Sequence, residues 1–298
     1  MTEQGHKRVA AIDCGTNSLR LLVADISPER GELVDLDRRM EIVRLGQGVD
    51  ATGRLAPEAL ARTFKVLTEY ARAISDSGAG AVRMVATSAT RDASNAEEFT
   101  AGVHKILGID PEVITGAQEA YLSFSGATAE LTHELPGSGK PEPPFLVVDI
   151  GGGSTEFVLG GMDAGSQPTD LAGISMDIGC VRLTERYLHG DPPTQDEVGA
   201  ATADVDAALA TVADAVPVAG AHTLVGLAGS VTTLTAVALG LTRYDPARVH
   251  HARVSADRVH QVTMSLLGKT RAERAADPVI HPGRVDVIAA GSLILEDQ

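Results

Sequence analysis

Apolar positions in the first 115 residues form the short alternating and continuous runs that predict strands, separated by two stretches of helical spacing. Strands are predicted at 9–12, 19–24, 40–45, 82–87 and 112–115, with a turn over 13–18. A helix opens at Pro57, carries an apolar face with the 3.6-residue period, and stops at Gly78. Ser94 and Glu97 are spaced as a capping box for a second helix, which Gly108 ends. The first half therefore has the order β-β-β-α-β-α-β.

The second half of the chain repeats the opening of the first. A strand at 145–150 runs into the turn Gly151–Gly152–Gly153, and a returning strand follows at 155–159. The further elements predicted are a surface loop over 132–144, a helix capped by Thr194 and Glu197, a strand over 224–227 and a helix from Ser230. This repetition predicts an internal duplication: an α/β fold of two domains, 1–124 and 125–298, that face a common cleft.

Composition narrows the classes of protein to which the chain can belong. Its 298 residues, 44% of them hydrophobic, suffice for two packed cores, and the net charge of −15 argues against duplex nucleic acid as a partner. No apolar run approaches the roughly 20 residues that a bilayer requires, and the polar N-terminus does not resemble a signal peptide, so we expect a cytoplasmic protein. Cys14 and Cys180 lack disulfide or zinc spacing, which predicts buried reduced thiols.

Both glycine turns follow an apolar strand that ends in an aspartate, Asp13 or Asp149. Glycines at such turns let backbone N–H groups converge on phosphate oxygens, and carboxylates at the strand ends suit Mg²⁺. A third element, in which a strand passes through Gly229 and Ser230 into a helix N-terminus, also favours an anion. The candidate phosphate-binding residues of the two turns are Gly15, Thr16, Asn17, Ser18, Gly151, Gly152, Gly153 and Ser154.

The amino-acid sequence of these segments resembles that of the exopolyphosphatase/guanosine pentaphosphate phosphohydrolase (Ppx/GppA) family. The segments that carry the resemblance span nearly the whole chain in order: 12–18, 44–48, 86–91, 116–120, 149–156, 177–185 and 284–288. The resemblance implies two actin-like (ribonuclease H-like) domains, each a mixed sheet with flanking helices. It is to the short, two-domain form, because the chain has no His-Asp dipeptide and no room for a further helical domain. A further helix is expected beyond 292–295, where the chain soon ends.

The resemblance also implies roles for individual residues. Glu119 falls at the position of the catalytic base; as an isolated residue it would equally suit a solvated helix glutamate. Asp149, Glu156 and Asp13 match acids that hold Mg²⁺ or Mn²⁺, although turn carboxylates bonded to nearby amides would look the same. Arg91 matches a phosphate-binding arginine, with a surface residue at a strand end as the alternative.

An acidic protein with a polyanionic substrate needs local positive charge. The segment 243–274 holds seven Lys or Arg against three acids, and we expect Arg253 and Arg258, together with Arg182 and Arg186, to line a polyanion path. An ordinary solvated helical surface explains the segment as well, and Arg182 has Glu185 three residues on as an ion-pair partner.

The activity implied is release of orthophosphate from the ends of inorganic polyphosphate, with water as the attacking group. The alternative is the same chemistry on guanosine pentaphosphate, a nucleotide of the stringent response. A non-catalytic nucleotide-sensing protein is a further alternative, but it predicts the loss of an acid at Asp13, Glu119, Asp149 or Glu156, and all four are present. Oligomeric state is open, with a homodimer as one option.

Overall fold

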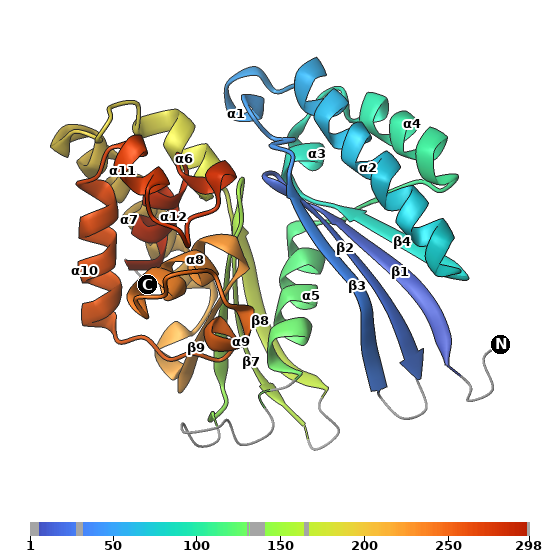
Figure 1. The fold of residues 1–298 in the computed structure, drawn as a ribbon. Coiled ribbons are helices and arrows are strands. Elements are labelled where there is room, and N and C mark those ends of the chain that lie inside the picture. Colours follow the sequence, from blue (N-terminus) through green and yellow to red (C-terminus); the bar gives the residue numbers. More distant parts are fainter. Residues whose placement is uncertain (1–5, 28–31, 130, 132–140, 164–166, 297–298) are drawn as a thin grey trace. The chain divides into compact units, whose positions relative to one another are not determined.

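The structure, a computed structural model, describes residues 6–27, 32–129, 131, 141–163 and 167–296. The chain divides into two compact units, Met1–Thr115 and Gly116–Gln298 (Figure 1). The domain boundary predicted between residues 124 and 125 falls inside a helix of the second unit. As a result Glu119 belongs to the same unit as Asp149 and Glu156.

The first unit is a mixed sheet with the strand order β3-β2-β1-β4-β5, in which β1 pairs antiparallel with β2 and parallel with β4. Helices α2 and α4 lie side by side on one face of it (Figure 1). Its elements are β1 Lys7–Cys14, β2 Ser18–Ser27, β3 Glu32–Ile42, α1 Val49–Thr52, α2 Pro57–Ser77, β4 Ala81–Ala86, α3 Ser88–Asp92, α4 Ala96–Leu107 and β5 Glu112–Val113.

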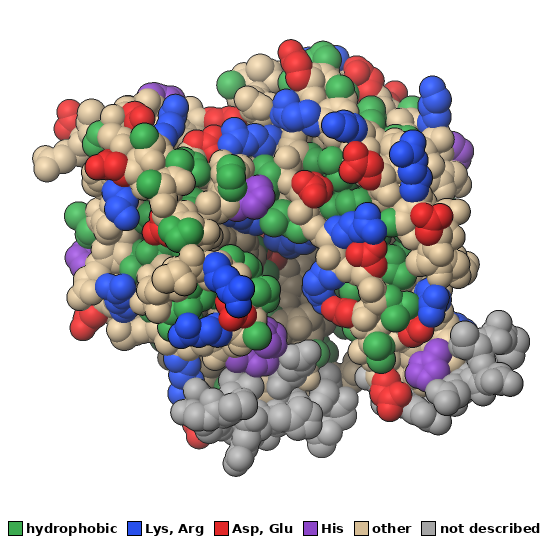
Figure 2. Space-filling model, viewed as in Figure 1, with side chains coloured by type: hydrophobic (Ala, Val, Ile, Leu, Met, Phe, Trp, Pro, Cys, Tyr) green, Lys and Arg blue, Asp and Glu red, His purple; other side chains and the backbone are tan. Residues whose placement is uncertain are grey.

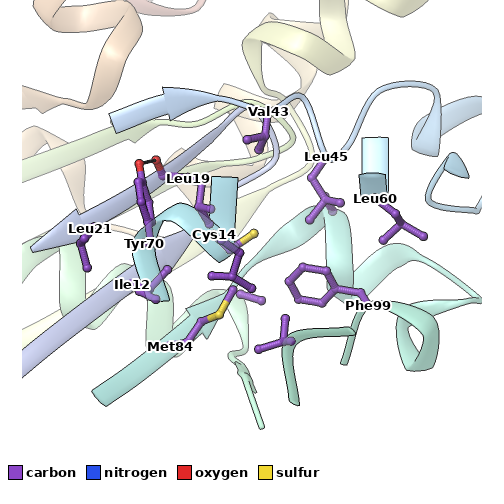
Figure 3. Packing of buried hydrophobic residues seen from close by; sticks show 14 of the residues in the cluster. Ile12, Cys14, Leu19, Leu21, Val43, Leu45, Leu60, Tyr70, Met84 and Phe99 are labelled. Carbon is purple, nitrogen blue, oxygen red and sulfur yellow. Dashed lines mark hydrogen bonds between the residues drawn. The ribbon is translucent and has the colours of Figure 1, made fainter. Parts of the chain in front are cut away.

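The core of the first unit lies between this sheet and the two helices. Figure 3 shows side chains of β1 and β2 meeting Tyr70 of α2 and Phe99 of α4. Phe99 is fully buried, and burying a side chain of this kind stabilises the fold by about 1.5–3 kcal/mol. The Tyr70 hydroxyl donates a hydrogen bond of 3.0 Å to the backbone carbonyl of Leu19, which fixes α2 against β2.

The second unit repeats this strand topology. Its sheet has the order β8-β7-β6-β9, with β6 antiparallel to β7 and parallel to β9. Its elements are α5 Gly116–Thr128, β6 Phe145–Ile150, β7 Thr155–Met162, β8 Pro168–Met176, α6 Cys180–Tyr187, α7 Gln195–Ala215, a 3-10 turn Val218–Gly220, β9 Thr223–Leu227, α8 Ala228–Ala238, α9 Pro246–Val249, α10 Ala256–Leu267, α11 Arg271–Ala275, a 3-10 turn Pro282–Arg284 and α12 Ile288–Glu296.

The two faces of this second sheet are covered by different helices (Figure 1). Side chains alternate along a strand. Leu146 and Val148 therefore point into a core shared with α6, α7 and α12, whereas Phe145 and Val147 point to the opposite face and pack against Phe124 of α5. Helix α5 thus packs on the second face, and this face carries the site described below.

Most predicted elements are confirmed, including the β-β-β-α-β-α-β order of the first half and the repeated topology. The capping box at Ser94 is wrong: Asn95 is the N-cap residue of α4, and the Ser94 hydroxyl donates instead to Gly53 O at 2.9 Å. The strand predicted at 40–45 starts earlier and ends at Ile42. The predicted loop over 132–144 lies outside the described residues up to 140, and residues 141–144 belong to no helix or strand.

Two elements that matter most for the site, α5 and β8, were not predicted as elements. In the part of the chain that the structure describes, no helix combines the length and apolar character that crossing a bilayer demands.

The cap of α7 yields a first prediction. The Glu197 amide donates to the Thr194 hydroxyl and the Glu197 carboxylate accepts from the Thr194 amide, as the capping-box spacing indicated. Replacement Thr194→Ala should therefore lower the free energy of unfolding by about 1 kcal/mol, measured by urea denaturation. Thr211→Ala is the matched control, since that exposed hydroxyl on the same helix only donates to its own turn. Equal effects of the two replacements would contradict the capping role.

Candidate active site

Three polar side chains form a row across one face of the second sheet. Asp149 of β6 pairs with Glu156 of β7, which in turn pairs with Ser175 of β8. Alternate residues of a strand lie on the same face of the sheet. Asp149 is two residues from Val147, and Glu156 is two residues from Val158, so both acids lie on the face that α5 covers. The strand register thus places two carboxylates side by side at the end of the β6–β7 hairpin.

Helix α5 brings the third carboxylate to this row. Ala120 and Phe124, four residues apart, pack on the sheet, and Glu119 and Ser123 occupy the adjacent stripe one turn apart. The start of the helix lies very close to β8, because a Cβ atom added at Gly116 would lie 2.5 Å from the Ser175 Cβ. Glycine at this position therefore permits the approach that sets Glu119 beside the acids of the sheet.

Hydrogen bonds orient both sheet acids. The Ser123 hydroxyl donates to Asp149 Oδ2 at 2.5 Å, and the Ser175 hydroxyl donates to Glu156 Oε1 at 2.7 Å. Glu156 is only 1% exposed. Burial, followed by the charges of Glu119 and Asp149, raises the pKa of Glu156 well above its ordinary range, while hydrogen bonds from Ser175 and Ser154 act in the opposite direction. Three carboxylates this close carry a charge repulsion that a bound cation would relieve.

The carboxylates of this site suit a hard divalent cation as part of its coordination shell. Among the described residues, no group of three or more His, Cys, Asp and Glu side chains has the arrangement of a complete metal site. Mg²⁺ in proteins is commonly held by one or two carboxylates together with water and substrate phosphate oxygens. Asp149 and Glu156 fit this incomplete type of site, in which substrate supplies the remaining ligands.

The carbonyl groups of the glycine turn between β6 and β7 accept hydrogen bonds from the start of α6. Gly151 O accepts from Cys180 N at 3.0 Å, and Gly152 O accepts from Val181 N at 2.9 Å. Arg182 Nε donates to Gly153 O at 2.7 Å. Within the described residues, the amides of Gly152 and Gly153 donate to no acceptor. The turn therefore presents unused N–H groups on the side away from α6, as an anion nest requires.

The turn between β1 and β2 in the first unit is built in the same way. Thr16 O accepts from Gly46 N at 2.9 Å, and Asn17 O accepts from the amides of Val43 and Arg44 at 3.0 and 2.9 Å. The amides of Thr16 and Asn17 have no acceptor among the described residues. The approach of the segment behind the turn again needs glycine, because a Cβ at Gly46 would overlap the Thr16 methyl group.

Polar atoms around this first turn are left unsatisfied. The side-chain amide of Asn17, 6% exposed, has no hydrogen-bond partner at either polar atom among the described residues, and neither has the buried Thr90 hydroxyl of α3. Ser88 at the start of α3 contacts Thr16 through a 2.9 Å hydroxyl pair, which ties α3 to the turn. Buried polar groups are normally paired, so this region of the first unit suits a polar ligand.

The other predicted residues of the first unit have protein partners. Asp13 forms a 3.3 Å ion pair with Arg20, its cross-strand neighbour. A cationic side chain thus lies beside the Asp13 carboxylate. Arg91 NH1 donates to the carbonyl of Ile114 at 2.9 Å, which holds the guanidinium at the end of α3.

The third predicted anion element lies next to a cation. Gly229 and Ser230 occupy the first turn of α8, which begins at Ala228. The guanidinium of Arg284 lies over Gly229 so closely that an added Cβ would overlap it. Ser230 is hydrogen-bonded to Cys180, and burial raises the pKa of that thiol, so Cys180 stays a neutral thiol. The prediction of buried free cysteines is confirmed for both Cys14 and Cys180.

The residues predicted to line a polyanion path fall into different environments. Arg182 is bound to Gly153 O, and Arg186 pairs with Asp204 at 3.2 Å. Arg253 and Arg258 are exposed, the latter donating to Ala238 O. On the face shown in Figure 2, basic side chains are scattered among acidic and apolar ones.

One arginine of the basic segment 243–274 cannot line a polyanion path, because it is buried. Arg274 is 2% exposed and donates to Leu266 O at 3.2 Å, and burial lowers its pKa. Its aliphatic stem and guanidinium are enclosed by the packing of α10 and α11, so it cannot offer charge to a ligand at the surface.

Ser123, Ser175 and Thr90 were missed as site residues. The spacing of Ser123 four residues after Glu119 was a usable signal, since such residues share a helix face. Ser175 had no local signal, because its neighbour Glu156 is 19 residues away in the chain and only the strand register joins them.

Comparisons with known proteins identify the family to which the chain belongs. The model of the Ppx/GppA phosphatase family matches residues 22–298. A Mycobacterium tuberculosis protein named Exopolyphosphatase 2 is 52% identical over 97% of this chain and 89% of its own length. The crystal structure of an exopolyphosphatase-like protein has a TM-score of 0.92 and 43% identity over 99% of this chain and 88% of its own.

The Aquifex aeolicus member of the Ppx/GppA family, also a crystal structure, has a TM-score of 0.75 and 34% identity over 98% of this chain and 89% of its own. These neighbours confirm the fold class, two mixed α/β domains of the actin-like type. From the motifs, the fold and these matches, the chain belongs to the Ppx/GppA phosphatase family.

Proposed function

We propose that this protein is an exopolyphosphatase, which releases orthophosphate from the ends of inorganic polyphosphate. The observation that carries the proposal is the combination, in one unit, of unused backbone amides at Gly152 and Gly153 with the carboxylates of Asp149, Glu156 and Glu119. Amides suit a phosphate, and clustered carboxylates suit a divalent cation and a base. The name of the 52% identical relative agrees with this substrate.

The terminal phosphate binds at the glycine turn of the second unit. The N–H groups of Gly152 and Gly153 donate to phosphate oxygens, and their positions are held by the bonds from α6 to the carbonyls of the same turn. In the first unit, the turn amides of Thr16 and Asn17 and the guanidinium of Arg91 are donors of the kind that suits a phosphate. Fixed donors of this type stabilise developing charge without reorganisation during the reaction.

A divalent cation, Mg²⁺ or Mn²⁺, would be held by Asp149 and Glu156. When bound, it would neutralise phosphate charge and so assist attack on phosphorus. Burial and neighbouring acids raise the pKa of Glu156, and a bound cation would favour its ionised carboxylate, the form that ligates a metal. The predicted contribution of Asp13 is weaker, since Arg20 already pairs with it.

Glu119 acts as the general base. Its carboxylate accepts a proton from water while the water oxygen bonds to the terminal phosphorus, and the bond from that phosphorus to the bridging oxygen breaks. The bridging oxygen leaves with the shortened chain, and the terminal group departs as orthophosphate. Guanosine pentaphosphate ends in the same kind of phosphoanhydride, so the same residues would serve that substrate.

We expect Glu119→Gln to retain the fold and substrate binding but to lose a factor of about 10² to 10⁴ in kcat, because the amide cannot accept the proton. The measurement is orthophosphate release from medium-chain polyphosphate with Mg²⁺. Glu97→Gln is the matched control, an exposed glutamate in the first turn of α4, and it should leave kcat unchanged. Turnover near that of the wild type in Glu119→Gln would exclude the base assignment.

The same assay with guanosine pentaphosphate distinguishes the two substrates. A higher kcat/KM for polyphosphate supports the proposal, whereas a higher value for the nucleotide would replace it with guanosine pentaphosphate hydrolysis. Absence of release from either substrate by the wild-type protein, with Mg²⁺ and with Mn²⁺, would refute phosphoanhydride hydrolysis altogether.

The metal assignment predicts that Asp149→Asn raises the Mg²⁺ concentration for half-maximal activity by at least about tenfold, because an amide keeps the shape but removes the charge that a hard cation prefers. Asp196→Asn, at an exposed site in the first turn of α7, should leave that concentration unchanged. Full activity of the wild-type protein in excess chelator would contradict a metal requirement.

The amide nest yields a prediction about Gly179. A Cβ at this position would lie 2.4 Å from Gly152 O, so Gly179→Ala must displace the turn from its backing segment. We expect a loss of about 1–3 kcal/mol in unfolding free energy and a raised KM. Gly199→Ala, where a Cβ meets open space on α7, should be neutral or stabilising by up to about 1 kcal/mol. If both variants have the wild-type KM, the turn does not bind substrate.

A further inference from the structure

Helix α5 contains several hydroxyl groups, and Ser123 is bonded differently from its neighbours. Ser125 donates to the carbonyl of Tyr121 at 2.8 Å, and Thr128 donates to the carbonyl of Phe124 at 2.7 Å. Both are bonds to the residue four positions back, the ordinary choice for a hydroxyl in a helix. Ser123 instead donates across to Asp149 Oδ2 at 2.5 Å.

This bond contributes to the orientation of the Asp149 carboxylate. An ionised carboxylate only accepts hydrogen bonds, so the Ser123 hydroxyl must be the donor. A short bond to a charged acceptor is about twice as strong as a neutral one. Asp149 is half-buried, so packing alone leaves its carboxylate more freedom than that of the fully buried Glu156.

The bond also connects the acid to the helix that carries the base. Glu119 and Ser123 are one turn apart on α5, and Ala120 and Phe124 of the same helix are packed into the sheet. The helix therefore cannot shift without moving both side chains together. Groups that orient a metal ligand from outside the coordination sphere typically contribute a factor of 10 to 100 in metal affinity.

We propose that Ser123 is a positioning residue for the metal-binding carboxylate of Asp149. Helix α5 then positions two groups at once: the base Glu119, which it carries, and, through Ser123, the carboxylate that holds the cation. This inference rests on the proposed function, because it requires that Asp149 hold a divalent cation. Ser123 itself touches neither substrate nor cation; it acts through Asp149.

The test is calorimetric titration of the protein with MgCl₂ in the presence of saturating orthophosphate, the reaction product, which supplies the phosphate ligands of the site. Ser123→Ala should raise the Mg²⁺ dissociation constant about 10- to 100-fold. Ser123→Thr keeps the hydroxyl, so its Mg²⁺ dissociation constant should stay near the wild-type value. Ser123→Val has nearly the shape of the threonine variant but no hydroxyl, so its dissociation constant should rise as that of Ser123→Ala does. Ser125→Ala is the matched control on the same helix and should leave Mg²⁺ binding unchanged. The Thr and Val pair keeps the test decisive if the alanine variant is unstable.

Kinetics supply an independent readout. In Ser123→Ala the Mg²⁺ concentration for half-maximal activity should rise with the dissociation constant, while kcat at saturating Mg²⁺ stays close to that of the wild type, since Glu119 and the turn amides are intact. If Ser123→Ala and Ser123→Val bind Mg²⁺ as tightly as the wild type while Asp149→Asn binds it weakly, the positioning role is refuted and the proposed function stands. If Asp149→Asn also binds Mg²⁺ normally, both the positioning role and the assignment of the cation to Asp149 are refuted, while phosphate release by the wild-type protein still decides the proposed function.

Discussion

The glycine turn of each unit is held by hydrogen bonds to its carbonyl groups, and these bonds fix the direction of the turn. Successive amides of a turn can form a nest for an anion where the protein itself leaves them unused. In the second unit the amides of Cys180 and Val181 bind the carbonyls of Gly151 and Gly152, so the turn amides point away from α6. In the first unit the segment around Val43 does the same for Thr16 and Asn17. In each unit, a segment distant in the sequence therefore donates hydrogen bonds to the carbonyl groups of the turn.

The second constraint is electrostatic. Burying Glu156 beside Asp149 and Glu119 costs free energy, as the raised pKa of Glu156 records. Such an arrangement persists in a fold when the surrounding packing determines it, and here strand register and the contact between Gly116 and Ser175 do so. Perturbed acids held this way are typical of sites that bind cations or move protons. The −15 net charge of the chain makes local amides and a cation more important for holding a polyanion.

Much of this could be predicted from sequence, and the failures have physical causes. The hairpins were predictable because strand periodicity and glycine turns are local signals, and the cap of α7 because its two partners are three residues apart. The capping box at Ser94 failed because Asn95 takes the N-cap position and bonds the backbone of Leu55, 40 residues away. Helix α5 was not predicted because its Gly, Ser and Thr content blurs the apolar stripe of Ala120 and Phe124. The roles of Glu119 and Glu156 came from family resemblance, and the burial that changes the chemistry of Glu156 is visible only in the fold.

In the proposed complex, the turn amides of Gly152 and Gly153 hold a phosphate beside a cation on Asp149 and Glu156. The decisive experiment is a crystal structure of the Glu119→Gln protein with Mg²⁺ and inorganic triphosphate, because this variant should bind without turning over. We expect oxygens of a terminal phosphate at hydrogen-bond distance from both amides, about 2.7–3.2 Å, with Mg²⁺ ligated by one or both acids. A triphosphate bound elsewhere, with the two amides in contact only with water, would contradict it.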